Sequence, residues 1–213
     1  MKEFKFEVTE IFKSFQGEGL NAGKQVVFIR FHECNLKCSF CDEKEKTSFH
    51  NMSVNDIVIA YQNLSREANL PIVFTGGEPT LIKSEMLSLL LLQLKIINSD
   101  YDKSQVFLET NGTLPIKNFL LFDHISVSPK CPLTIIPHVL EYVNEFKYCV
   151  SSKIKNIVRE NLIYQSKTWR KNIPTFVQPI NNLPENIEIC LKLIEEFPNV
   201  RLGYQLQKYW RIK

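Results

Sequence analysis

Apolar positions along the chain fall into two patterns, short runs rich in Val, Ile and Phe, and longer stretches with helical spacing. Several of the short runs are nearly continuous in apolar residues, which is typical of strands buried on both faces of a sheet. They predict strands over residues 4–12, 26–31, 72–75, 106–109, 124–127, 146–150, 175–178 and 201–205. Helical spacing predicts helices over residues 53–68, 84–98, 151–161 and 184–196. The first begins with a capping pair, Ser53 and Asp56.

Strands and helices alternate along most of the sequence, and this alternation predicts an α/β fold with a mostly parallel sheet. We find no repeat, low-complexity tract or linker in the sequence. The 213 residues therefore predict a single domain over 1–213, long enough to bury its own core.

Composition narrows the class of protein. The sequence is 44% hydrophobic and 23% charged, as in soluble globular proteins, and its net charge of +3 gives no reason to expect a nucleic-acid partner. The first ten residues carry charges where a secretory signal would be apolar. The most apolar stretch, 87–97, is too short to span a membrane. We therefore expect a cytoplasmic protein with reduced cysteines and no membrane partner.

Five short motifs each follow a predicted strand. They are CNLKCSFC, TGGEPT, ETNG, SPK and QP. In a parallel sheet or barrel, the loops after the carboxyl ends of the strands converge and build the site. The motifs are therefore predicted to lie at one edge of the sheet.

Cys34, Cys38 and Cys41 are the first candidates for metal ligands. A closed structural zinc site needs four protein ligands, so zinc would require His32 or His50 as well. Three thiolates on one loop also suit an iron–sulfur cubane whose fourth iron stays open to a ligand. Spacing alone leaves both possibilities open.

The Cys-x3-Cys-x2-Cys spacing, followed by Gly-Gly-Glu-Pro after a later strand, resembles the radical S-adenosylmethionine superfamily. The resemblance implies a [4Fe–4S] cluster on the three cysteines, with the open iron bound to the methionine part of S-adenosylmethionine. Phe40 matches the aromatic residue usual between the last two cysteines. Gly76 and Gly77 let the main chain approach a ligand closely, and Glu78 offers a carboxylate to an ammonium group.

A second set of motifs, QGEG upstream and SPK, EFKYCV and FVQPI downstream, resembles the 7-carboxy-7-deazaguanine synthase family, often called QueE. This resemblance implies a partial or modified (β/α) barrel of the TIM-like kind, with a radical SAM core. It also implies the ring contraction of 6-carboxy-5,6,7,8-tetrahydropterin to 7-carboxy-7-deazaguanine with loss of ammonia, in queuosine-type 7-deazapurine biosynthesis. A 5′-deoxyadenosyl radical takes a hydrogen atom from C6 of the pterin and later returns it.

The family resemblance also implies roles for single residues. The substrate contacts are Gln16, Glu18, Arg30, Thr75 and Gln207, with Arg30 suited to a bidentate contact with the substrate carboxylate. The contacts to S-adenosylmethionine are Ser128, Lys130 and Gln178, together with the Gly-Gly-Glu motif. A flavodoxin or ferredoxin reductant and a homodimer are implied as well.

Three positions depart from the family pattern, and the first is Glu33, which stands where a small residue usually precedes the first cysteine. Glu43 stands where a threonine is usual, and that threonine is implicated in binding Mg²⁺; a carboxylate is also a hard oxygen ligand, so Glu43 is a possible magnesium ligand. Gln207 stands where a histidine is usual, and its amide cannot titrate. Two alternatives remain open, another small radical enzyme such as a glycyl-radical activating protein, and a non-catalytic zinc-binding module.

Overall fold

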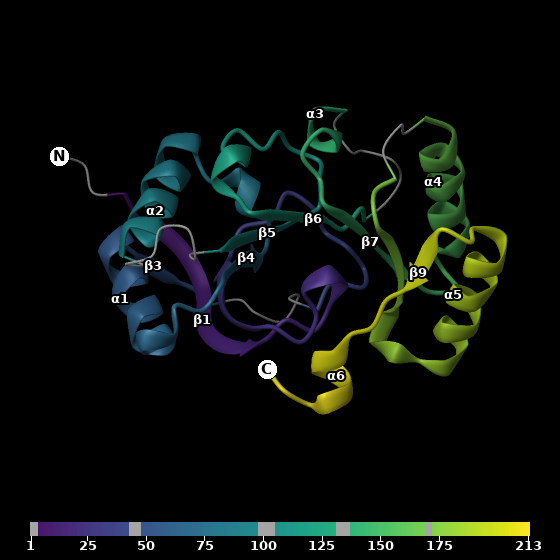
Figure 1. Cartoon of the computed structure of the whole chain (residues 1–213), viewed down its shortest axis with the longest axis horizontal. Coiled ribbons are helices and arrows are strands. Elements are labelled where there is room, and N and C mark those ends of the chain that lie inside the picture. Colours follow the sequence, from purple (N-terminus) through teal and green to yellow (C-terminus); the bar gives the residue numbers. More distant parts are fainter. Residues whose placement is uncertain (1–3, 43–47, 98–104, 131–136, 169–171) are drawn as a thin grey trace. The chain divides into compact units, whose positions relative to one another are not determined.

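The computed structural model of the chain describes residues 4–42, 48–97, 105–130, 137–168 and 172–213. The chain divides into two compact units (Figure 1). The first unit consists of Met1–Ser14, Gln25–Thr110 and Leu114–Ile125, and the second of Phe15–Lys24, Asn111–Thr113 and Ser126–Lys213. The single-domain expectation stays a prediction.

The first unit is built on the strands β1 (Phe6–Phe15), β2 (Gln25–Phe31), β3 (His50–Met52), β4 (Ile72–Gly76) and β5 (Val106–Thr110). Their order is β3-β1-β2-β4-β5. β2, β4 and β5 pair in parallel, and β3 pairs antiparallel with β1. Parallel pairing places the carboxyl ends of β2, β4 and β5 at one edge, where the cysteine loop and the Gly-Gly-Glu motif begin.

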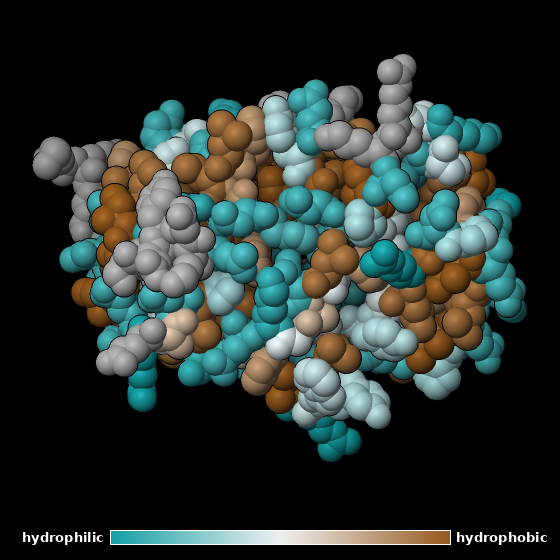
Figure 2. Space-filling view, in the orientation of Figure 1, coloured by the Kyte–Doolittle hydropathy of each residue, from teal (hydrophilic) through white to brown (hydrophobic). Residues whose placement is uncertain are grey.

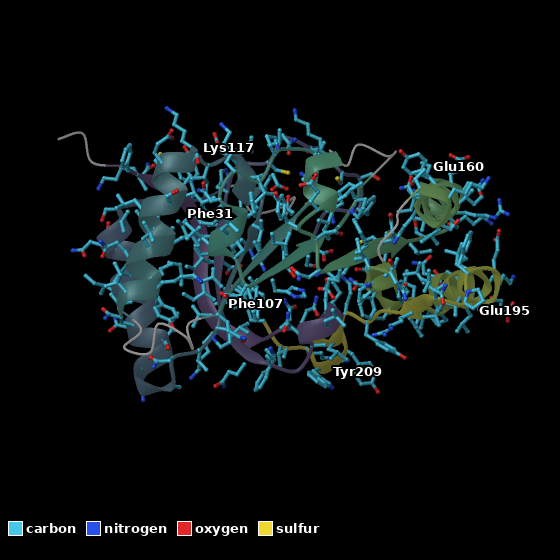
Figure 3. All side chains as sticks on the ribbon, turned by 45° about the horizontal axis from the view of Figure 1, so that its top comes forward. Phe31, Phe107, Lys117, Glu160, Glu195 and Tyr209 are labelled. Atoms are coloured by element: carbon cyan, nitrogen blue, oxygen red, sulfur yellow. The ribbon has the colours of Figure 1, made fainter. Side chains whose placement is uncertain are left out.

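Helices of the first unit cover its sheet with apolar faces. They are α1 (Val54–Ser65) and α2 (Ser84–Ile97), which lie side by side (Figure 1). Ser53 caps α1: its hydroxyl accepts a hydrogen bond from the Asp56 amide at 3.2 Å, and Asp56 accepts one from the Ser53 amide at 2.8 Å. The predicted capping pair is thus a full capping box. One core cluster contains Phe107, labelled in Figure 3, with Phe12, Val26, Phe28 and Val73.

The second unit contains β7 (Glu145–Val150), β8 (Thr175–Pro179) and β9 (Val200–Leu202), all parallel, with the end of β6 (His124–Val127) beside β7. Its helices are α3 (Pro137–Leu140), α4 (Lys155–Thr168), α5 (Pro184–Glu196) and α6 (Leu206–Trp210). α5 packs on β8 and β9, and α4 on β7. Glu160 on α4 and Glu195 on α5 are exposed to solvent (Figure 3).

Short 3₁₀ turns connect several of these elements. They are η1 (Gly19–Asn21), η2 (Arg66–Ala68), η3 (Pro79–Leu81), η4 (Phe119–Leu121) and η5 (Ile180–Asn182). Two of them matter for the site: η1 follows Glu18 directly, and η3 follows Glu78.

All eight predicted strands are confirmed, with ends that differ by a few residues. The last is shorter than predicted, because the chain leaves the sheet after Leu202. The helix predicted over 151–161 was misplaced: residues 151–154 form a turn, and α4 runs from Lys155 to Thr168. β3, α3 and α6 were not predicted, since elements of three to five residues carry too little periodicity.

Two further observations concern apolar surface. No helix in the described part of the chain is long and apolar enough to cross a membrane. Hydrophobic residues gather over α5 in the space-filling view (Figure 2). α5 buries Cys190 and Leu193 against its sheet and leaves Leu191 47% exposed.

Candidate functional site

The cysteine loop follows β2 in the first unit. Cys34 and Cys41 are exposed and Cys38 is half-buried, and no disulfide joins the described cysteines. The Cys41 amide donates to the Cys38 carbonyl at 3.3 Å, and the Leu36 amide approaches the Cys34 sulfur at 3.5 Å. Phe40 is half-buried between the second and third cysteines. The thiols are therefore accessible on a turn-rich loop, as ligands for an external group must be.

The Gly-Gly-Glu backbone is hydrogen-bonded to the beginning of the cysteine loop. The Gly77 amide donates to the Phe31 carbonyl at 2.9 Å, and the Glu78 amide donates to the Glu33 carbonyl at 2.6 Å. A Cβ on Gly77 would overlap main-chain atoms of His32 and Glu33. Gly76 has φ +109°, a value that favours glycine. Both glycines are thus required for this close approach of two loops.

Glu78 is only 1% exposed. Its Oε1 accepts hydrogen bonds from the Thr80 amide at 3.1 Å, the Thr80 hydroxyl at 2.7 Å and the Thr110 hydroxyl at 2.7 Å. These contacts give the carboxylate a role in shaping the turn. The predicted contact between Glu78 and the cofactor's ammonium group stays a prediction.

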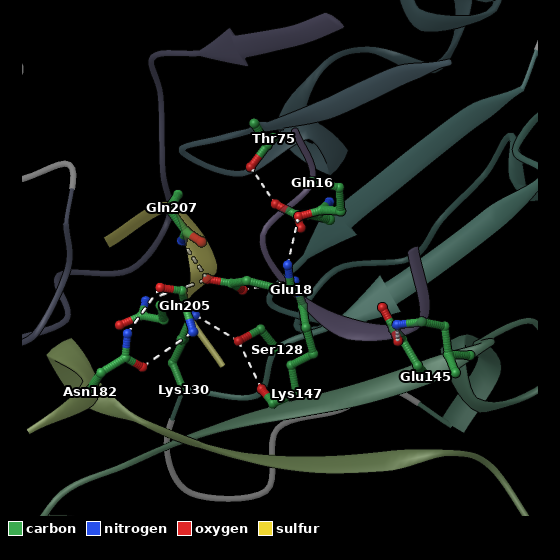
Figure 4. A network of polar contacts seen from close by, with 12 residues as sticks. Gln16, Glu18, Thr75, Ser128, Lys130, Glu145, Lys147, Asn182, Gln205 and Gln207 are labelled. Atoms are coloured by element: carbon green, nitrogen blue, oxygen red, sulfur yellow. Dashed lines mark hydrogen bonds and ion pairs between the residues drawn. The ribbon is translucent and has the colours of Figure 1, made fainter. Parts of the chain in front are cut away.

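Two predicted substrate residues in the first unit have polar partners at strand ends. The Arg30 guanidinium pairs with Glu10, with 3.3 Å between Nη1 and Oε1, and it lies 5.3 Å from the centre of the Phe12 ring. The Thr75 hydroxyl donates to the Glu109 carboxylate at 2.8 Å, a contact drawn in Figure 4. Arg30 and Thr75 face each other across the β2–β4 register.

The donor set on the cysteine loop fits an iron–sulfur cluster. Three thiols within eight positions match a cubane that leaves one iron open. Within the residues that the structure describes, no three His, Cys, Asp or Glu side chains are grouped around a point that could hold a single metal ion. His32 contacts Thr9 and the Phe49 ring, and His50 lies in β3.

Glu18 is the centre of a polar network in the second unit (Figure 4). Its Oε2 accepts a hydrogen bond from Lys147 Nζ at 3.0 Å, and its Oε1 accepts one from Gln207 Nε2 at 2.9 Å. Gln205 Nε2 lies 3.4 Å from the same Oε1. The Gln16 side chain accepts from the Glu18 amide at 3.2 Å. One carboxylate is thus held by donors from β7 and from the segment around α6.

The loop that carries Glu18 closes on itself. The Gln16 amide donates to the Lys24 carbonyl, and the Gly23 amide donates to the Gln16 carbonyl, both at 2.8 Å. Gly19 has φ +66° and packs against the Glu145 carboxylate, which accepts a hydrogen bond from the Leu20 amide at 2.6 Å. A side chain at Gly19 would collide with that carboxylate. The glycine after Glu18 is therefore needed for both its backbone angle and its lack of a side chain.

Burial has one effect on the pKa of Glu18, and a neighbouring charge and hydrogen bonds have the opposite effect. Burial raises the pKa of this carboxyl, but the charge of Lys147 and hydrogen bonds from Gln207, Lys147 and Gln178 outweigh that effect and lower the pKa to about 2. Glu18 is therefore an ionised acceptor at neutral pH, which suits the N–H groups of a heterocycle.

The predicted contacts to S-adenosylmethionine lie at the ends of β6 and β8. Lys130 Nζ donates to the Ser128 hydroxyl at 2.8 Å, and that hydroxyl donates to the Lys147 carbonyl at 2.9 Å. Gln178 is 2% exposed, and its Oε1 has no hydrogen-bond partner among the described residues. The same holds for Oε1 of Gln207. Such buried acceptors are available to a ligand.

Three residues of the Glu18 network were not predicted. They are Glu145, Lys147 and Gln205. A signal for the first two was present: two opposite charges stand two positions apart in an otherwise apolar strand. Glu43, the possible magnesium ligand, lies outside the described residues, so its role stays a prediction.

Comparison with known proteins agrees with these features. The radical SAM superfamily model matches residues 28–197. A 7-carboxy-7-deazaguanine synthase of Rickettsia prowazekii is 34% identical over 98% of this chain and 89% of its own length. Another, of Clostridium acetobutylicum, is 37% identical over 95% of each chain.

A solved structure is similar as well. The crystal structure of QueE from Escherichia coli covers 94% of each chain with a TM-score of 0.73 at 24% identity. This likeness confirms the predicted fold class, a mostly parallel α/β sheet in a partial barrel. The chain belongs to the radical SAM superfamily and, within it, to the 7-carboxy-7-deazaguanine synthase family.

Proposed function

We propose that the chain catalyses the ring contraction of 6-carboxy-5,6,7,8-tetrahydropterin to 7-carboxy-7-deazaguanine, a step of queuosine-type 7-deazapurine biosynthesis. Substrate and product differ by one molecule of ammonia, so the reaction needs no net oxidant or reductant. Besides family membership, the observation that carries the proposal is the Glu18 carboxylate, which Lys147, Gln207 and Gln178 keep ionised in the loop over residues 16–24.

In the first unit, Cys34, Cys38 and Cys41 would hold the [4Fe–4S] cluster. When bound, the cluster and S-adenosylmethionine supply a 5′-deoxyadenosyl radical. The main chain of Gly76 and Gly77 would contact the cofactor, together with Phe40 and Glu78. Such contacts would position the cofactor for the reaction.

Substrate recognition follows the charges of the pterin. Arg30 binds the 6-carboxylate through its guanidinium, and Thr75 borders the ring. Glu18 accepts hydrogen bonds from the 2-amino group and the adjacent ring N–H, and Gln16 and Gln207 frame this edge. An ionised carboxylate is selective here, because it accepts hydrogen bonds and donates none.

The remaining proposals concern the cofactor, the metal ion, the electron donor, the cellular compartment and the oligomeric state. Ser128, Lys130 and Gln178 bind polar groups of S-adenosylmethionine. Glu43 would be one ligand of a bound Mg²⁺. A flavodoxin or a ferredoxin supplies the electron, and the enzyme works in the cytoplasm as a homodimer. These assignments rest on the family resemblance.

Anaerobic incubation tests the reaction. The cluster-loaded protein is mixed with dithionite, S-adenosylmethionine and the carboxytetrahydropterin, and products are followed by mass. We expect 7-carboxy-7-deazaguanine from the unmodified chain and from Cys149→Ala, which removes a thiol distant in sequence from the loop. We expect none from Cys38→Ala. If 5′-deoxyadenosine accumulates without the deazaguanine, the substrate is wrong, and a different radical enzyme such as a glycyl-radical activating protein is favoured.

Magnesium is tested in the same assay. If Glu43 binds the ion, removal of Mg²⁺ slows product formation, and Glu43→Thr changes the Mg²⁺ concentration needed for half-maximal rate. A rate that ignores both changes removes Glu43 from the mechanism.

A further inference from the structure

β7 carries two oppositely charged side chains on one face, and both are buried. Glu145 and Lys147 are two residues apart, so their side chains leave the strand on the same side. They are 2% and 3% exposed. A buried charge is strongly destabilising unless it is paired. Both side chains must therefore have partners that compensate for the burial of their charges.

Both partners belong to the loop over residues 16–24, and the Glu18–Lys147 pair is drawn in Figure 4. Glu145 accepts from the Leu20 amide at 2.6 Å, which fixes the main chain immediately after Glu18. Lys147 Nζ donates to Glu18 Oε2 at 3.0 Å, which fixes the side chain. The Lys147 side chain is 4% exposed and that of Glu18 is 18% exposed. The pair is thus largely protected from solvent screening, while one side of Glu18 remains accessible.

We infer that Lys147 is a positioning residue. It keeps the Glu18 carboxylate ionised and oriented so that this carboxylate can accept hydrogen bonds from the two adjacent N–H donors of a 2-aminopyrimidin-4-one ring. This inference rests on the proposed function and deepens it. Glu145 assists by holding the main chain of the loop that carries Glu18.

The electrostatic surroundings support this assignment. Two charged groups of β7, Lys147 and Glu145, contact the Glu18 loop, and Lys130 is connected through the Ser128 hydroxyl to the main chain of Lys147. β8 and the segment around α6 contribute the neutral amides Gln178, Gln205 and Gln207. Lys147 is therefore the cation that opposes the effect of burial on the pKa of Glu18.

The side chain and the main chain of Lys147 have different partners, so the role of the side chain can be tested separately from that of the main chain. Its carbonyl accepts the Ser128 hydroxyl, which in turn accepts from Lys130. Replacement of the Lys147 side chain leaves this carbonyl in place. Pterin binding should therefore change while binding of S-adenosylmethionine does not.

The test measures equilibrium binding of the carboxytetrahydropterin to cluster-loaded, unreduced enzyme with S-adenosylmethionine, between pH 6 and pH 8.5. We expect Lys147→Met to weaken pterin binding about 10- to 100-fold at pH 7. Binding to this variant should weaken further as the pH falls, because unopposed burial raises the pKa of Glu18 and protonates it. The ratio to unmodified enzyme cancels titration of the pterin itself.

Matched variants sharpen the result. Lys147→Arg keeps the charge and should keep the pH profile of the unmodified enzyme, and Lys192→Met, at an exposed position of α5, should change nothing. In a Glu18→Gln background, Lys147→Met should add less than about twofold, because both changes then act on one interaction. If Lys147→Met does not fold, Lys147→Gln serves in its place.

Three outcomes overturn the inference. The first is that Lys147→Met binds the pterin within twofold of the unmodified enzyme and with the same pH profile. The others are that Lys147→Met has an undiminished effect in Glu18→Gln, or that it weakens S-adenosylmethionine binding as much as pterin binding. The failure of the proposed function gives a different result. In that case the unmodified enzyme neither binds the pterin nor forms the deazaguanine.

Discussion

Nη1 of Arg30 lies 3.3 Å from Oε1 of Glu10, so an acidic neighbour on β1 orients the guanidinium that we assign to the substrate carboxylate. Stacking over the Phe12 ring, 5.3 Å from its centre, restricts the same group further. An arginine held in this way has lost part of its rotamer freedom before a ligand arrives. Preorganisation of this kind favours affinity.

Replacement of Arg30 by lysine should therefore weaken substrate binding although the charge is kept. We expect a loss of about 1.5–3 kcal/mol, or about 10- to 100-fold, since an ammonium cannot make the bidentate contact. Equilibrium binding measures this loss. A tetrahydropterin without the 6-carboxylate is the control, and it should bind both proteins equally. An equal loss for both ligands would show that Arg30 does not read the carboxylate.

Gly77→Ala should disturb the cysteine loop. The new Cβ would overlap main-chain atoms of His32 and Glu33, and overpacking of this kind costs about 1–3 kcal/mol. We expect a lower melting temperature and less iron bound after anaerobic reconstitution. Lys37→Ala, an exposed change on the same loop, should keep both values. Normal iron content in Gly77→Ala would mean that the two loops tolerate separation.

The capping box of α1 can be tested apart from the site. Ser53→Ala removes the hydroxyl that accepts from the Asp56 amide and should cost about 1 kcal/mol of unfolding free energy. The hydrogen bonds from Ser53 lower the pKa of Asp56, so that pKa should rise in the variant. Urea unfolding and NMR titration measure the two effects. Ser166→Ala, on an exposed face of α4, should change stability by less than about 0.5 kcal/mol.

Glu18 should make stability depend on pH in the acid range. Its pKa is lowered from 4.5 to about 2 in the folded chain, so its contribution is fully present above about pH 4.5 and is lost as the pH falls through 2. The loss should be about 3 kcal/mol, and Glu18→Gln should not show it. Unfolding free energies of the two proteins between pH 6 and pH 2 measure this difference. Parallel curves would contradict the ion pair.

The strands were predictable because parallel strands buried on both faces leave nearly continuous apolar runs in the sequence, as in 26–29 and 72–74. The misplaced helix shows the limit of this reasoning. The amides of Ile154 and Lys155 both donate to the Ser151 carbonyl, and this turn delays the start of α4. Short elements such as α6 depend on tertiary contacts rather than on their own propensity.

The same contrast applies to the site. The cysteines and the Gly-Gly-Glu motif were found because each is contiguous in the sequence. Glu145, Lys147 and Gln205 were missed, because their roles arise only from contacts that the fold creates. A charged residue inside an apolar strand was a signal of such contacts, and the strand over 146–150 carried it.

The partners of the QGEG loop are far away along the chain. Leu20 and Glu145 are 125 positions apart, and Glu18 and Gln207 are 189 positions apart. A nascent chain cannot complete this loop until α6 has been synthesised, and contacts of such high sequence separation form slowly in folding. The loop is therefore among the last parts of the protein to acquire its structure, so a ribosome-bound chain that stops before Gln205 lacks the substrate-binding carboxylate in its final form.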